Sequence, residues 1–167
     1  MVQGWFPDGP HLPVEFSRVS PDGRVTLVLV EGAPTVPALW ANTGLAELAE
    51  ARRVLARREG IEPGEMDLHV GFWSPREQSG GVAAEVIGSW AESRGFPGAV
   101  WTALPPGLKG DWGSLPSSQA LLAHLGELSP DVLTRAREYV ERAPAAVDTP
   151  FRRRLAAELG WTLHGEA

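Results

Sequence analysis

The 167-residue chain contains no cysteine and only one lysine, Lys109. Without cysteine there is no disulfide, no thiolate nucleophile and no zinc site built on Cys ligands. No apolar run approaches the roughly 18 residues that a membrane-spanning helix needs. The opening residues, MVQGWFPDGPHLP, form neither a basic nor an apolar leader, so we expect a cytoplasmic protein with no membrane partner.

The net charge of -6 disfavours nucleic acid as a partner, because phosphate binding needs clustered positive charge. The local exceptions are Arg135, Arg137, Arg142 and the run Arg152–Arg154. A nucleic-acid surface there is an alternative, but such a run is more typical of a solvated helix face. We therefore expect no nucleic-acid partner.

Sequence motifs for metals and cofactors are lacking as well. The histidines are scattered without metal-ligand spacing, and there is no P-loop, no G-x-S-x-G and no G-x-G-x-x-G after a strand. We expect no metal and no cofactor, and the sequence leaves the oligomeric state open.

The clearest structural pattern is a β-hairpin. Residues 13–20 alternate apolar and polar side chains, residues 20–23 (SPDG) are a strong turn, and residues 25–30 (VTLVLV) return as a buried strand. A third strand is predicted over residues 36–41. Asn42 or Thr43 is then expected to cap an amphipathic helix that ends at Gly60, a natural C-terminal cap.

Shorter elements follow this helix. The pattern predicts strands over residues 66–73 and 99–104, a helix over 82–94, and flexible loops at 75–81 and 105–118.

The last third of the chain reads as helical. Ser117 or Ser118 caps one predicted helix, Ser129 a second, and Asp148 or Thr149 a third.

These elements predict an α+β fold in one domain, residues 1–167. Residues 1–11 would be an irregular lead-in, residues 12–104 a β-rich core with two helices, and residues 117–160 a helical C-terminal part. We expect a small mixed sheet of about five strands, partly closed or a barrel, wrapped by helices that lie mostly in the C-terminal half.

Glu59 is the candidate catalytic residue. At the helix C-terminus its carboxylate faces exposed carbonyls, which disfavours the charged form and suits a general acid or base. The alternative is a solvated surface Glu, balanced by Arg57 and Arg58. Trp73 and Trp101 would line a small-molecule pocket if they faced one cavity, but core packing is the safer assumption for each taken singly.

The hairpin LPVEFSRVSPDGRVTLVLV, followed by VPALWA and a helix ending in REG, resembles the γ-glutamylcyclotransferase-like family. The resemblance implies that Glu59 is the acid/base. The Asp that the family has shortly before this glutamate is absent here, and Ala56 and Arg57 stand in that vicinity. The family's opening Tyr-Gly-Ser turn, which binds substrate through its amides, has no counterpart in MVQGWFPDGP. The chain also resembles, over nearly its whole length, a group of bacterial proteins without known activity.

Two functions follow from these observations. The first is γ-glutamylcyclotransferase-like acyl transfer, in which Glu59 assists the cyclisation of a small γ-glutamyl or related amide. The alternative is a non-catalytic domain on the same scaffold that binds a small molecule or another protein. The missing glycine-serine turn favours the alternative.

Overall fold

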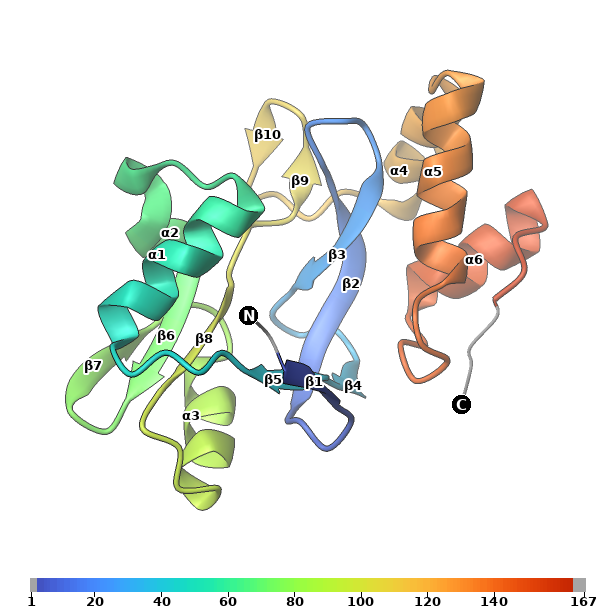
Figure 1. The fold of residues 1–167 in the computed structure, drawn as a ribbon. Helices are drawn as coiled ribbons and strands as arrows, with labels where there is room; N and C mark the ends of the chain where they lie inside the picture. The colour runs from blue at the N-terminus through green and yellow to red at the C-terminus, as the bar shows by residue number, and fades with distance from the viewer. Residues whose placement is uncertain (1–2, 164–167) are drawn as a thin grey trace. The chain divides into compact units, whose positions relative to one another are not determined.

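The computed structural model describes residues 3–163 and combines helices with strands, which confirms the predicted α+β character (Figure 1). The chain forms two units. The first unit is Met1–Pro13 with Pro37–Leu104, and the second is Val14–Val36 with Pro105–Ala167. The single domain expected over residues 1–167 stays a prediction.

The helices are α1 (Leu48–Glu59), α2 (Met66–His69), α3 (Ala84–Ser93), α4 (Ser118–Gly126), α5 (Pro130–Glu141) and α6 (Pro150–Leu159), with a 3₁₀ turn at Pro63–Glu65. The strands are β1 (Gln3–Phe6), β2 (His11–Val19), β3 (Val25–Leu29), β4 (Thr35–Pro37), β5 (Trp40–Asn42), β6 (Val70–Ser74), β7 (Glu77–Gly80), β8 (Ala99–Thr102), β9 (Gly107–Leu108) and β10 (Asp111–Trp112).

The strands form three sheets, ordered β1-β5, β10-β9-β2-β3 with β4 also paired to β2, and β7-β6-β8. Within residues 3–163 none of these sheets closes into a barrel. Nor does any helix in this part of the chain combine the length and apolarity needed to cross a bilayer.

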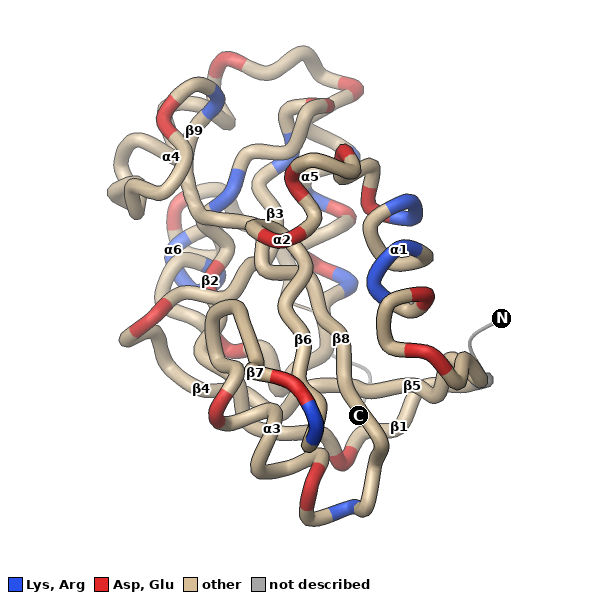
Figure 2. Tube along the Cα trace, turned by 90° about the vertical axis from the view of Figure 1, so that its left-hand side faces the viewer, with Lys and Arg blue, Asp and Glu red and all other residues tan. Residues whose placement is uncertain are grey.

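In the first unit, the β7-β6-β8 sheet lies between α1 and α3 (Figure 2). Side chains of β6 alternate between the two faces. Val70 packs with Ala56 and Ile61 on the α1 side, and Phe72 lies beneath the guanidinium of Arg52 at 4.2 Å. Glu50 lies in the first turn of α1 and Arg57 and Arg58 in its last turn, which complements the helix dipole, while Glu59 is its final residue (Figure 2).

The lead-in predicted as irregular contains a strand, β1, which pairs with β5. Phe6 stacks on Trp40 with ring centroids 4.5 Å apart. Asp8 accepts hydrogen bonds from the Trp40 indole at 2.7 Å and from Arg94 at 2.7 Å. These two hydrogen bonds, that from Trp40 first, hold the pKa of Asp8 below its ordinary value. The prediction was wrong because the partners of this segment lie far along the chain.

The helix cap predicted at Asn42 or Thr43 was also wrong, because these side chains close local turns instead. The Asn42 side chain accepts from the amide of Gly44 at 2.8 Å, and Thr43 accepts from the amide of Leu45 at 3.2 Å. The helix begins only at Leu48, after the predicted third strand has split into β4 and β5.

Two further segments differ from the prediction. The strand expected from residue 66 begins only at Val70, because the turn opened by Pro63 continues into α2. The region of residues 12–104 therefore holds three α-helices rather than two. The expected flexible loop at 75–81 contains β7, which pairs antiparallel with β6.

The second unit confirms the predicted hairpin and the C-terminal helices. β2 pairs antiparallel with β3. The Ser117 side chain caps α4 through the amide of Ala120 at 3.1 Å, and Thr149 caps α6 through the amide of Arg152 at 3.3 Å. The carboxylate of Glu15 on β2 accepts from another amide in the first turn of α6, at 3.3 Å. This contact ties the hairpin to the helix.

Candidate binding pocket

Glu59 lies at the C-terminal end of α1, where Gly60 takes the left-handed conformation with φ 67°. This helix end confirms the predicted stop at Gly60. The Glu59 carboxylate lies 3.2 Å from the guanidinium of its neighbour Arg58, and its side chain is 29% exposed. Its catalytic role stays a prediction.

Trp73 and Trp101 lie on the same face of the β6-β8 pair, because Trp101 is the register partner of Gly71, two residues before Trp73. Their rings are packed against backbone. A Cβ on Gly71 would lie 2.2 Å from the Trp101 ring, and one on Gly88 of α3 would lie 2.3 Å from the Trp73 ring. The Trp101 indole donates to the Val82 carbonyl at 3.0 Å. A substrate-binding role for the two rings stays a prediction.

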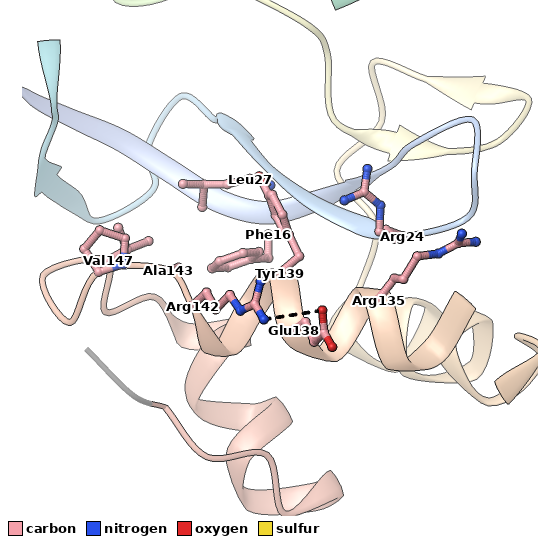
Figure 3. Close-up of a pocket in the computed structure, with 10 residues that line it drawn as sticks. Phe16, Arg24, Leu27, Arg135, Glu138, Tyr139, Arg142, Ala143 and Val147 are labelled. Carbon is pink, nitrogen blue, oxygen red and sulfur yellow. Dashed lines mark hydrogen bonds and ion pairs between the residues drawn. The ribbon is translucent and has the colours of Figure 1, made fainter. Parts of the chain in front are cut away.

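A concave site of about 540 Å³ lies in the second unit, between the β2-β3 hairpin and α5 (Figure 3). This volume falls within the range of about 300–1,000 Å³ that small-molecule pockets occupy. Aromatic, aliphatic and charged side chains share the lining: Phe16, Arg24, Leu27, Arg135, Glu138, Tyr139, Arg142, Ala143, Pro144 and Val147.

One face of α5 supplies the helical wall of this pocket. Arg135, Glu138, Tyr139 and Arg142 follow the i, i+3, i+4, i+7 spacing that places side chains on a single face. The buried residues Ala136 and Val140 belong to a different face of the same helix. α5 therefore presents one surface to the core and another to the pocket.

The aromatic side chains give the pocket a fixed middle. Phe16 is fully buried, and the ring of Tyr139 meets it edge-on, with centroids 6.1 Å apart and planes at 83°. The Tyr139 hydroxyl accepts from the backbone amide of Leu27 on β3 at 3.5 Å. Tyr139 is thus held at its ring and at its hydroxyl.

The two ends of the pocket differ in polarity. Figure 3 shows Val147 and Ala143 at one end and Arg24 and Arg135 at the other. An apolar body at the first end and a negative group at the second would both find complementary surroundings. The arrangement suits an amphipathic anion.

Arg152 stabilises the segment of residues 143–147, which forms the apolar end of the pocket. Arg152 itself is only 1% exposed. Its guanidinium donates to the carbonyls of Pro144 at 2.7 Å and Val147 at 2.9 Å, and also to that of Ala143. These three residues line the pocket. Burial lowers the pKa of the Arg152 guanidinium from its ordinary value, while the charge of Asp148 opposes that change.

Sequence reasoning placed Arg135 and Arg142 only in a nucleic-acid alternative, and it missed Phe16, Leu27 and Tyr139 as lining residues. The signal that could have found the helical wall is the spacing of polar side chains on α5 beside a separate buried stripe. The contribution of β2 and β3 depends on tertiary packing, which no local pattern reports.

Comparisons of the chain with protein-family models, curated proteins and solved structures give no match. The resemblance to the γ-glutamylcyclotransferase-like family therefore stays a prediction. Over the part of the chain that the structure describes, no group of three His, Asp or Glu side chains is placed to hold a metal ion. Function is inferred from the pocket's own chemistry.

Replacing Arg152 with Ala should lower the free energy of unfolding by roughly 3 kcal/mol, because the buried carbonyl of Val147 and the partly buried carbonyls of Ala143 and Pro144 lose a charged donor. Urea denaturation, monitored by tryptophan fluorescence, measures this loss. Arg154→Ala is the matched control, since Arg154 is exposed and pairs with Glu158 on its own helix, a contact worth less than about 1 kcal/mol. Equal losses in the two variants would contradict the supporting role of Arg152.

Proposed function

We propose that this protein is a non-catalytic small-molecule-binding protein whose ligand is a partly apolar organic anion. The observation that carries the proposal is the polarity of the pocket between β3 and α5. Its aliphatic end and its arginine end are joined by the fixed Tyr139 ring (Figure 3). Ligand pockets of this kind are mainly apolar, with a few polar groups that fix orientation.

The arginines supply that orientation. Arg24 lies across the face of the Tyr139 ring, with its guanidinium 5.5 Å from the ring centroid. Arg135 on α5 and Arg142 at its C-terminal cap stand about two helical turns apart on the same face. A guanidinium donates through a planar fork that matches the two oxygens of a carboxylate or the oxygens of a phosphate.

Substituting Arg135 with Gln should weaken the binding of 4-phenylbutanoate about tenfold, because a charge-assisted hydrogen bond contributes about 1.5 kcal/mol or more. Isothermal titration calorimetry measures the dissociation constants. Arg53→Gln is the control, since Arg53 is exposed on α1 in the first unit. A wild-type protein that binds no organic anion, or equal weakening by both substitutions, would refute the proposal.

The second candidate function is γ-glutamylcyclotransferase-like acyl transfer, favoured by the observed helix end at Glu59 and Gly60. Glu59 would take a proton from the α-amine of a γ-glutamyl amide. The amine nitrogen would bond to the γ-acyl carbon, the amide C–N bond would break, and the leaving amine would take the proton back. A partly closed sheet wrapped by helices is the scaffold that this candidate implies.

Under this second candidate, Glu59→Gln should lower turnover of γ-glutamyl amides by about 100-fold or more, the usual contribution of a positioned base. The rate is measured from release of the free amine, which is quantified by chromatography. Glu62→Gln, a change at an exposed residue three positions later, should leave it unaltered. Undiminished turnover in the Glu59 variant would remove Glu59 from the reaction.

A further inference from the structure

The three arginines of the pocket differ in how far nearby carboxylates already neutralise them. Arg24 pairs with Asp22 at 2.7 Å, and Arg142 pairs more loosely with Glu138 at 3.8 Å. Among residues 3–163, no carboxylate is within ion-pair distance of Arg135. Arg135 is therefore the cation whose donors are open to a ligand.

Two carboxylates accompany these cations. Glu138 lines the pocket itself, one helical turn from Arg135 (Figure 3). Asp22 stays beside Arg24 because its carboxylate also accepts from the Ser20 hydroxyl, at 2.5 Å. Glu138 would repel the second negative charge of a dianion. A singly charged group bound at Arg135 would be repelled less.

The opposite end of the pocket has no carboxylate in its lining, and the Arg142–Glu138 pair lies between the two ends (Figure 3). Leu27, Ala143, Pro144 and Val147 are aliphatic, and Val147 is nearly fully buried. The Tyr139 ring borders this end, and its edge contact with Phe16 and its hydroxyl contact with the Leu27 amide orient it. A flat or narrow hydrocarbon chain can lie along it.

We infer that the ligand is a monocarboxylate with an aryl or alkyl chain, an inference that rests on the proposed function. Its carboxylate binds Arg135, and its chain extends past Tyr139 toward Val147. Glu138 acts as the specificity residue that discriminates against phosphate monoesters and other dianions. The one free cation among the described lining residues and its neighbouring carboxylate together set the preferred charge at minus one.

The test compares three probes with the same hydrocarbon: 4-phenylbutanoate, 4-phenylbutyl phosphate and 4-phenylbutylamine. At pH 7.5 the phosphate monoester is mostly a dianion, because its second pKa is about 6. Wild-type protein should bind the carboxylate at least about fivefold more tightly than the phosphate, and the amine most weakly. Isothermal titration calorimetry at fixed ionic strength gives all three constants.

Glu138→Gln should then abolish the discrimination, bringing the phosphate to within about twofold of the carboxylate or below it. Glu158→Gln is the control and should leave the wild-type ratio unchanged, since Glu158 lies on α6 and pairs with Arg154. A wild-type preference for the phosphate, or an unchanged ratio in Glu138→Gln, would overturn the charge inference alone. If none of the three probes binds, the proposed function falls as well.

Discussion

The second unit depends on one buried cation. Arg152 has only 1% of its surface exposed, and its guanidinium gathers carbonyls from the end of α5 and from the segment that follows it. The Val147 carbonyl is buried, and leaving a buried carbonyl without a donor is costly. The same segment provides the aliphatic end of the pocket. A cation that is not among the lining residues of the pocket thus stabilises its aliphatic end.

The pocket depends on α5, which packs into the core with one face and lines the pocket with another. Ala136 and Val140 fill the core, while Tyr139 closes against Phe16 and the amide of Leu27. Packing on the first face orients the second, so Arg135 is presented from a helix rather than from a loop. Sites on rigid elements lose little conformational freedom when a ligand binds.

The sequence was informative wherever a local rule sufficed. The Ser-Pro-Asp-Gly turn, the cap at Thr149 and the stop at Gly60 all follow from short-range chemistry, and the structure confirms each of them. It was uninformative where a partner lies far along the chain, as for β1 beside β5. Arg152 is the clearest case: a run of arginines is typical of a solvated face, and only the surrounding carbonyls reveal its burial.

The most direct test of the central claim is a side-chain NMR titration with 4-phenylbutanoate, following the arginine Nε–Hε signals and the Tyr139 ring. Binding in the proposed pocket predicts saturable shifts for Arg135 and Tyr139 that give one dissociation constant, with Arg58 at the end of α1 unaffected. Shifts centred on Arg58 and the neighbouring Glu59, with Arg135 silent, would contradict it and place the functional site in the first unit.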